Sequence, residues 1–452
     1  MLNVLLVSPN QERAPDPVPP IGAAYVADAA RRAGHAVRIA DACFDGPTFP
    51  GHLARELDEL RPDVVGLSLR NVDNTTLFGT ESYVPAYREV ARVVREHAPR
   101  AKLVLGGSAF TLFPHALLEA LGADHGIAGE GEAQFVALLD RLDGSAEQPP
   151  EGLLWGVPSD LGPRARPARD LVDLARYHRE GGSTNLQTKR GCAFQCSYCS
   201  YPALEGARIR TRRPEDVVDE IEGVLREHGI DCFFFVDSVF NVPPDHAVGI
   251  CDEIVRRNLE ITWSAYLSPA AVTARLFESM ARSGCRSVDF GTDAASPATL
   301  VALRKGFGVE DVRLASALCR EHGIKFSHSL VLGGPGETWS TLDETVANVV
   351  ATEPTAVVAV AGVRLHPGTE LAARAIAEGQ VAHGAIGLEP VFYVSEAVRD
   401  GLLDRLAGIG KRHRNWFIPG ITPPVPEPLR ARLRARGAEG PLWEQLSRGA
   451  SR

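Results

Sequence analysis

Three cysteines crowd into one short loop of this chain, at Cys192, Cys196 and Cys199 within the stretch K-R-G-C-A-F-Q-C-S-Y-C. The other cysteines are scattered singly along the sequence. A C-x3-C-x2-C spacing lets three thiolates converge, because a loop of this length folds back easily on itself. A structural zinc ion normally has four protein ligands, and no fourth Cys or His lies near the loop at a usual finger spacing.

Three thiolates suit a four-iron cluster in which one iron has no protein ligand. A catalytic metal site keeps such an open position for a substrate or cosubstrate. The cysteine spacings of ferredoxins differ from this one, which argues against pure electron transfer. The residues themselves leave two alternatives open: a three-cysteine zinc site and a loop that binds no metal.

Composition and charge narrow the class of protein. A length of 452 residues with 44% hydrophobic and 23% charged residues predicts a globular protein of two domains and a tail. The net charge of −9 gives no support for nucleic-acid binding. The longest apolar stretch, near 356–363, is much shorter than the roughly 18 residues of a membrane span. The N-terminal MLNVLLVSP lacks the features of a signal peptide, so a reducing cytoplasm is expected.

Residues 1–145 alternate strand-like and helix-like patterns five times. Short apolar runs lie at 3–9, 36–42, 63–70, 102–109 and 125–132. Such runs between helices predict a parallel sheet covered on both faces, which binds ligands at the carboxyl ends of its strands. These ends carry small and polar residues, namely Ser8, Arg70, Asn71, Gly106, Gly107, Gly129 and Glu130. No G-x-G-x-x-G follows the first strand, which disfavours a dinucleotide; glycines that merely form turns are the alternative.

A second series of β-α units follows an irregular linker at 146–182 and fills residues 183–370. Its strand candidates are 183–190, 232–238, 261–267, 287–293, 326–334 and 355–363. Six such units predict a partial (β/α)6 barrel of the TIM type, with its functional face at the carboxyl ends of the strands. The cysteine loop follows the first of these strands and therefore lies on that face. Residues 371–452 are expected to form a helical segment over the barrel mouth or side. Within it, four alternating arginines at 430–436 are interpreted as a solvated face.

The cysteine loop, with an aromatic residue before its last cysteine, resembles the signature of radical S-adenosylmethionine (SAM) enzymes. Segments 235–241, 291–296 and 333–338 resemble further motifs of that family, in the family's order. Each motif alone is weak, but four at the ends of successive strands are strong. The resemblance implies that the three cysteines hold a [4Fe–4S] cluster whose open iron binds SAM. It further implies SAM contacts at Tyr198, Asp237, Asp293, Ser296, Gly333 and Gly334.

In front of the barrel, the sheet domain contains the segments PPIGAAYVADAARRAGHAVRIADA, RPDVVGLSLRN, VLGGSAF and GEGE. These segments are similar to the N-terminal domain of the cobalamin-binding subgroup of the same family, so the resemblance covers residues 1 to about 370. It implies an α/β fold in which a Rossmann-like (flavodoxin-like) cobalamin domain precedes the radical SAM barrel. The turn at 70–71 is the candidate for the lower face of cobalamin, and residues 106–107 for its nucleotide tail. The D-x-H-x-x-G motif is absent, which agrees with this subgroup, where no protein histidine binds cobalt. A domain that has lost cobalamin is the alternative.

The family resemblance also implies an activity. The reduced cluster would cleave SAM, a 5′-deoxyadenosyl radical would remove a hydrogen from an unactivated carbon, and methylcobalamin would supply a methyl group. The predicted function is therefore a C-methyltransferase that acts on an unactivated carbon of a lipid or secondary-metabolite substrate. The expected partners are this small-molecule or lipid substrate and an electron donor such as flavodoxin or ferredoxin. A radical cyclase or rearrangement enzyme without net methyl transfer is the alternative, and a cobalamin-dependent sensor is the non-enzymatic one.

Overall fold

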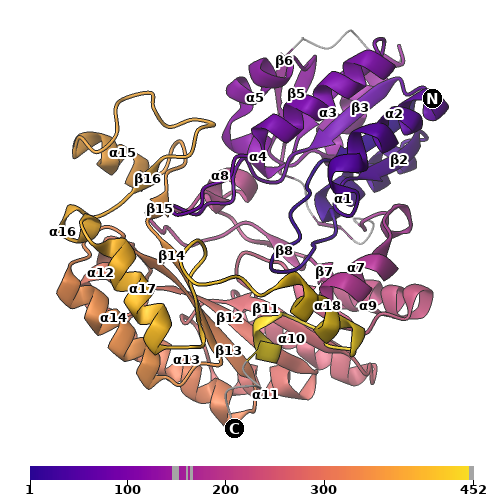
Figure 1. The fold of residues 1–452 in the computed structure, drawn as a ribbon. Coiled ribbons are helices and arrows are strands. Elements are labelled where there is room, and N and C mark those ends of the chain that lie inside the picture. The colour runs from indigo at the N-terminus through magenta and orange to yellow at the C-terminus, as the bar shows by residue number, and fades with distance from the viewer. Residues whose placement is uncertain (145–151, 159–160, 163–165, 447–452) are drawn as a thin grey trace.

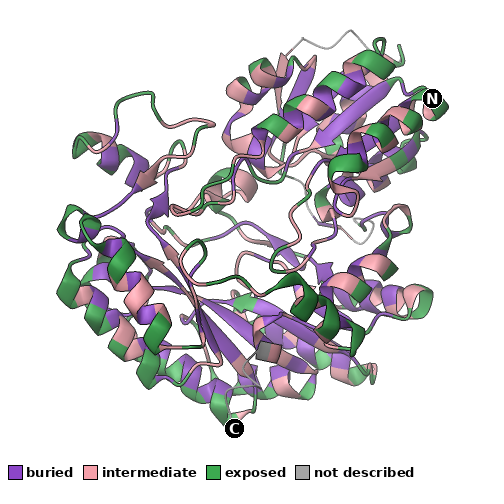
Figure 2. Ribbon diagram, viewed as in Figure 1, coloured by how far each residue is buried: buried purple, intermediate pink, exposed green. Residues whose placement is uncertain are grey.

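The computed structural model of the chain describes residues 1–144, 152–158, 161–162 and 166–446. These residues form two α/β domains, each built on its own sheet (Figure 1). In both domains the strands are mostly buried, while the outer faces of the helices meet solvent (Figure 2). No helix among the described residues is long and apolar enough to cross a membrane.

The first domain contains a six-stranded parallel sheet with the spatial order β2-β1-β3-β4-β5-β6. Its strands are β1 (Asn3–Ser8), β2 (Ala36–Asp41), β3 (Val64–Ser68), β4 (Lys102–Gly106), β5 (His125–Ala128) and β6 (Gly152–Trp155). The strand order reverses between β1 and β3, which is the switch point where such sheets bind ligands. The predicted flavodoxin-like topology is confirmed.

The strands of this sheet are apolar throughout because helices cover both faces. The helices are α1 (Ile21–Arg32), α2 (Phe49–Leu60), α3 (Val84–His97), α4 (Ser108–Leu112), α5 (Pro114–Leu121) and α6 (Glu132–Leu142). Leu5 and Val7 of β1 pack into a core with α2 and α3. Val4 and Leu6 point to the other face and pack with α1 and α6. Each fully buried side chain of this kind contributes about 1.5–3 kcal/mol, so both faces stabilise the sheet.

Strand β6 lies within the stretch that was expected to be a linker, 146–182. It pairs in parallel with β5, from His125 opposite Gly152 to Ala128 opposite Trp155. The first sheet therefore continues to residue 155. A four-residue run is too short to show a strand period in the sequence.

The second domain contains a seven-stranded sheet with the order β17-β14-β13-β12-β11-β10-β7, and all neighbouring strands are parallel. Its strands are β7 (Thr184–Leu186), β10 (Cys232–Phe235), β11 (Thr262–Leu267), β12 (Cys285–Asp293), β13 (Lys325–Leu332), β14 (Ala356–Ala361) and β17 (Trp416–Phe417). The outer helices are α9 (Pro214–His228), α10 (Pro244–Arg256), α11 (Ala274–Arg282), α13 (Val309–Glu321) and α14 (Trp339–Ala351). The predicted partial barrel is confirmed.

The C-terminal segment contributes more than helices. Strand β17 joins the sheet beside β14, with Trp416 opposite Val357. Helices α15 (Glu370–Ala377), α17 (Leu402–Arg412), α18 (Glu427–Ala435) and α19 (Trp443–Leu446) account for much of the remainder. A two-residue strand has no detectable period, so the sequence pattern showed only the helices.

The interpretation of the four alternating arginines as a solvated face is wrong for Arg434. Its side chain is buried, and its guanidinium donates to Asp16 and to the carbonyls of Ala438 (2.8 Å) and Gly440 (2.9 Å). Asp16 belongs to the loop between β1 and α1. Helix α18 therefore ties the C-terminal segment to the first domain, a contact that depends on tertiary packing and not on the spacing of the arginines.

Candidate active site

The cysteine loop lies between β8 (Lys189–Arg190) and α8 (Tyr201–Glu205). All three of its thiols are free, with Cys192 buried and the other two partly exposed. Burial raises the pKa of Cys199 to about 11, and the charges of Cys196 and Cys192 act in the same direction. The three side chains therefore lie close enough to influence one another, and coordination to a metal would be what deprotonates them.

The spread of the three sulfur atoms suits a cluster better than a single ion. Within the described part of the chain, the one group with three ligand atoms within 4.8 Å of one another is His178, Asp231 and Glu439. The cysteine sulfurs are thus spread more widely than this limit. Ligands of a single zinc ion lie closer together, since each zinc–sulfur bond is only about 2.3 Å long.

Asp237, which follows β10, holds the strand in front of the cysteine loop. Its carboxylate accepts from the backbone N–H of Thr188 (2.7 Å), from the Thr188 hydroxyl (2.5 Å) and from the N–H of Lys189 (3.2 Å). The Lys189 ammonium lies 3.9 Å from the same carboxylate and donates to the carbonyl of Val242 at 3.0 Å. All these side chains are buried apart from Val242, which supplies only its backbone. Asp237 therefore positions the loop, and its expected contact with SAM stays a prediction.

Asp293 and Tyr198, both expected at the SAM site, are brought together at the end of β12. The Asp293 carboxylate accepts from the Tyr198 hydroxyl and from the ammonium of Lys305 (2.5 Å). Lys305 is buried, and its charge acts on the thiol of Cys196. The arrangement places a fixed cation between a carboxylate and the cysteine loop. Sequence reasoning missed Lys305, whose only signal was a lone lysine between the apolar residues of LRKGF.

The other expected SAM residues lie in turns on the same face. The Ser296 hydroxyl, at the start of α12 (Pro297–Ala302), donates to Glu344 of α14 at 2.6 Å. The Gly333 N–H donates to the carboxylate of Glu337, a group whose pKa burial raises to about 7. Gly333 has a φ of +89°, a conformation that favours glycine over other residues. Gly334 directly follows it in the turn. The Ser296 side chain is therefore directed to α14, not to the Asp293 cluster.

The expected cobalamin residues at 70–71 and 106–107 lie in two turns that contact each other. The Arg70 carbonyl accepts from the Ser108 hydroxyl (2.6 Å), and the Asn71 carbonyl accepts from the hydroxyl of Tyr87 (2.5 Å). Gly107 has a φ of +92°, and a Cβ there would lie 2.5 Å from the carbonyl oxygen of Leu69. The turn thus requires glycine for close backbone packing. It leaves both Arg70 and Asn71 exposed.

Ser8, Gly129 and Glu130 lie at the ends of β1 and β5. The Ser8 side chain is buried and lowers the pKa of Asp41 by hydrogen bonding, against the larger effect of burial. The Gly129 N–H donates to the Thr111 hydroxyl at 2.9 Å. The Glu130 carboxylate pairs with Arg190 (3.0 Å) and also with Arg210, both in the second domain. The structure therefore gives Glu130 a role between the domains.

Buried ion pairs join the two domains at two places. Arg190, directly before the cysteine loop, pairs with Glu130 at 3.0 Å and with Glu132 at 2.6 Å. Arg364, which ends β15 (Val363–Arg364), pairs with Asp73 at 2.8 Å, and both of those side chains are at most 3% exposed. Glu130 and Asp73 lie in loops after first-domain strands, and Glu132 begins α6 directly after such a loop. These pairs hold the carboxyl ends of the two sheets toward each other.

The inner face of the second sheet carries accessible aromatic surface. Along β10 and β11 the residues Phe233, Phe235, Trp263 and Ala265 are buried against the outer helices, whereas Tyr266 points inward and is 45% exposed. Its ring lies 4.8 Å from that of Phe234, edge to face. Burial nevertheless raises the pKa of Tyr266 to about 12, and the charge of Arg70 lowers it. The Tyr266 ring is therefore exposed to the space between the sheets, although protein lies close on several sides. The Arg70 turn lies near this ring.

Helix α19 closes the amino end of the same inner face. Glu444 is fully buried and accepts from the hydroxyl of Ser287 and the guanidinium of Arg286 (2.7 Å). The Lys325 ammonium donates to the Glu444 carbonyl at 3.0 Å. Both β12 and β13 begin at these residues, so α19 lies opposite the cysteine loop. The C-terminal segment was expected to cover the mouth or side of the barrel, whereas α19 lies at the opposite, amino end.

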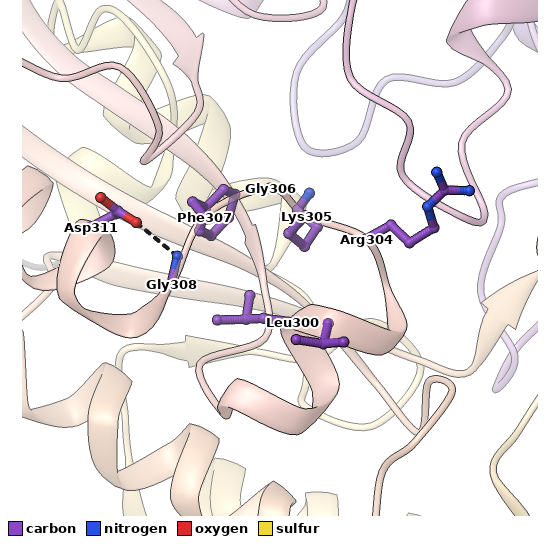
Figure 3. A pocket seen from close by; sticks show the side chains of 8 residues that line it. Leu300, Arg304, Lys305, Gly306, Phe307, Gly308 and Asp311 are labelled. Carbon is purple, nitrogen blue, oxygen red and sulfur yellow. Dashed lines mark hydrogen bonds between the residues drawn. The ribbon is translucent and has the colours of Figure 1, made fainter.

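A separate pocket of about 440 Å³ lies on the turn between α12 and α13. Figure 3 shows its lining, in which Arg304, Lys305 and Phe307 follow one another along the turn. Lys305 is the residue that this pocket shares with the Asp293 cluster, since Arg304 pairs instead with the exposed Glu370. The pocket therefore adjoins the cysteine loop without being part of the inner face of the sheet.

Comparison with known families agrees with this geometry. A family model described as the B12 binding domain matches residues 11–139. A model of the radical SAM superfamily matches residues 186–349, a stretch that contains the cysteine loop and the strands β10–β13. Together, fold, site and matches define a radical SAM protein that carries a cobalamin-binding domain in front of its barrel.

The relatives narrow this class. The chain is 28% identical over 370 residues to an uncharacterised methyltransferase of Pyrococcus horikoshii, with 76% of this chain and 77% of the relative covered. It is 26% identical over 444 residues to tryptophan 2-C-methyltransferase of Streptomyces laurentii, with 82% and 74% covered. The structure of the radical SAM methyltransferase TsrM of Kitasatospora setae, with cobalamin and a [4Fe–4S] cluster bound, matches over all of both chains with a TM-score of 0.84 and 26% identity. The chain thus combines a B12 binding domain with a radical SAM domain, and the proteins it is similar to include cobalamin-dependent radical SAM methyltransferases.

Proposed function

We propose that this enzyme transfers a methyl group to a carbon atom of a small molecule held against the inner face of the second sheet. One observation carries the proposal. The buried ion pairs of Arg190 and Arg364 hold the first domain so that its Arg70 turn lies near the accessible Tyr266 of that inner face, and Arg190 directly precedes the cysteine loop. A substrate on the inner face would thus lie between the two cofactor sites. Positioning and exclusion of water are what a protein adds to such cofactor chemistry.

The residues present fit the groups that this function requires. Cys192, Cys196 and Cys199 are free thiols in one loop and would hold the [4Fe–4S] cluster. The switch point of the first sheet would hold cobalamin through the turn at 70–71 and the ends of β1, β4 and β5, with Ser8, Gly106, Gly107 and Gly129. When bound, the cluster supplies an electron to SAM and cobalamin supplies the methyl group. A flavodoxin or ferredoxin in the cytoplasm is proposed as the reductant.

SAM would lie beside Asp293, Tyr198 and Lys305. The ammonium of Lys305 would attract the carboxylate of SAM, and Asp293 would accept from its amino or hydroxyl groups. Because Asp293 already accepts from Tyr198 and Lys305, the side chain is held in one orientation before SAM binds. Such preorganisation lowers the cost of binding.

Replacing Lys305 with methionine is expected to raise the KM for SAM by about 10- to 100-fold, since a hydrogen bond to a charged group contributes about 1.5–3 kcal/mol. The change removes the cation and leaves the Asp293 carboxylate to repel the carboxylate of SAM. SAM consumption by the reconstituted enzyme, measured against SAM concentration, checks this. Arg304→Met is the matched control, because Arg304 is the adjacent cation but is exposed and paired with Glu370. Equal changes in both variants would contradict a specific role for Lys305.

The proposed activity is tested by anaerobic reconstitution with iron, sulfide and hydroxocobalamin, followed by incubation with deuteromethyl-SAM, a low-potential reductant and a panel of aromatic amines that includes tryptophan. Methyl transfer predicts S-adenosylhomocysteine together with 5′-deoxyadenosine and a product that carries the deuterated methyl group. Formation of 5′-deoxyadenosine alone, with a rearranged product, would favour the cyclase alternative. Cluster and cobalamin loading without any SAM consumption would favour a sensor.

A further inference from the structure

The inner face of the second sheet carries one carboxylate that the cofactor sites leave unused, Asp289. It lies on β12 directly beside Tyr266 of β11 and Ser327 of β13 in the strand register. Ser287, two residues earlier on the same face, contacts Glu444 of α19. Asp293, at the carboxyl end of the same strand, belongs to the SAM cluster. Asp289 thus lies between the closed amino end of the sheet and the cofactor sites, at the level of the accessible Tyr266 ring.

Asp289 is buried, and none of the described cationic side chains neutralises its charge. Its residue is 8% exposed, and its carboxylate accepts from the Ser327 hydroxyl and interacts with the side chain of Trp443. No ion pair to Asp289 occurs within the described part of the chain. Burial raises the pKa of Asp289 to about 6, and the like charge of Glu444 acts in the same direction. Aspartates are almost never fully buried unless paired.

The surroundings of Asp289 indicate what could supply the missing charge. On the side of the first domain, Tyr266 presents a ring that is 45% exposed and is supported edge to face by Phe234. An aromatic ring binds planar groups and cations well. A carboxylate beside such a ring is therefore suited to a ligand that has a planar group and, at one end, a protonated amine or another strong N–H donor.

We propose that Asp289 binds the protonated amine of the substrate while Tyr266 and Phe234 contact its planar part. The substrate class is therefore a small arylalkylamine, in which the amine is separated from the aromatic ring and is protonated at neutral pH. Identifying this ligand as the substrate rests on the proposed function. The binding site itself does not, because it is defined by Asp289, Ser327 and the two rings. The competing explanation is that Asp289 only anchors α19 through Trp443.

The test is binding of two probes to the cluster- and cobalamin-loaded enzyme without SAM, measured by ligand-observed NMR at pH 8. Phenethylamine and 3-phenylpropanoate share a phenyl ring and differ in the sign of their charge. The native enzyme is expected to bind phenethylamine at least about tenfold more tightly, as for a charge-assisted hydrogen bond. Asp289→Asn, which keeps an oxygen acceptor for Ser327, is expected to bring the two affinities within about twofold of each other. Tyr266→Leu should weaken both probes equally.

Asp252→Asn is the matched control, because Asp252 also accepts from a serine hydroxyl, that of Ser279 at 3.3 Å, but lies on the outer helix α10. It should leave the preference unchanged. The proposal is overturned if the native enzyme binds neither probe or shows no preference. The proposal is also overturned if Asp289→Asn keeps the preference for phenethylamine. If trypsin then cleaves the C-terminal segment of this variant faster than that of the native enzyme, Asp289 only anchors α19. An enzyme that shows the preference but forms no S-adenosylhomocysteine would overturn only the proposed function.

Discussion

Replacing Cys192 with alanine is expected to abolish SAM cleavage and to leave the purified protein without its [4Fe–4S] cluster. Two thiolates cannot hold a cluster that needs three protein ligands, and the described loop offers no substitute ligand. Cys192 is also the most buried of the three thiols, so water cannot replace it easily. Iron and sulfide analysis, the visible absorption of the cluster and 5′-deoxyadenosine formation after reconstitution measure the result. The same outcome is expected for Cys196 and Cys199.

The matched control for this prediction is Cys251→Ala. Cys251 lies on the outer helix α10, is fully buried and packs in the core of the second domain. Its loss should cost about 1 kcal/mol of stability through the small cavity that it leaves, while iron content and SAM cleavage stay at the native level. Retention of a full cluster in Cys192→Ala would show that the three cysteines are not its ligands.

Replacing Glu130 with glutamine is expected to lower the free energy of unfolding by about 3–5 kcal/mol, the usual effect of removing one partner of a buried ion pair. Arg190 and Arg210, each at most 10% exposed, would lose the carboxylate that they share. The contacts of Asp237 that position the cysteine loop lie within the second domain and would remain. Methyl transfer should therefore decrease more than SAM cleavage, because the distance between the domains is what changes.

The control for Glu130 is Asp170→Asn. Asp170 pairs with Arg31 of α1 at 2.6 Å, but its side chain is 60% exposed. An exposed pair contributes only about 0–1 kcal/mol, so both stability and the ratio of methyl transfer to SAM cleavage should stay nearly unchanged. Urea unfolding and product ratios measure the two effects. Equal decreases of methyl transfer and SAM cleavage in Glu130→Gln would contradict a positioning role for the ion pairs of Glu130 with Arg190 and Arg210.

Several features were predictable because they depend on residues that are close in the sequence. The spacing of Cys192, Cys196 and Cys199 restricts them to one loop whatever the rest of the chain does. The apolar runs of β1 and β3 reveal strands that are buried on both faces. The β-α alternation then restricts the possible topologies to a few, since parallel strands need crossover connections of one hand. The family resemblance supplied the cofactors, and the matching family models confirm that assignment.

Other features could not be predicted, because they depend on contacts between distant residues. Glu130 stands at a strand end, as a ligand-binding residue would, yet its partners are Arg190 and Arg210, 60 and 80 residues away. In the sequence, Lys305 is 12 residues from Asp293 and much farther from the cysteine loop, although in space it lies beside both. Arg434 was expected in solvent, and it is buried beside Asp16.

The sequence by itself therefore determined the two sheets and the cysteine loop, because periodicity and short spacings follow from local backbone geometry. The class of cofactors came from the resemblance of its motifs to a known family. Only the tertiary structure decided which charges meet. It pairs Arg190 with the first domain, directs Ser296 toward α14, and closes the amino end of the barrel with Glu444. It also buries Asp289 with no cationic partner among the described residues. The physical reason is that burial and ion pairing depend on how the domains pack, and the spacing of residues along the chain does not predict that packing.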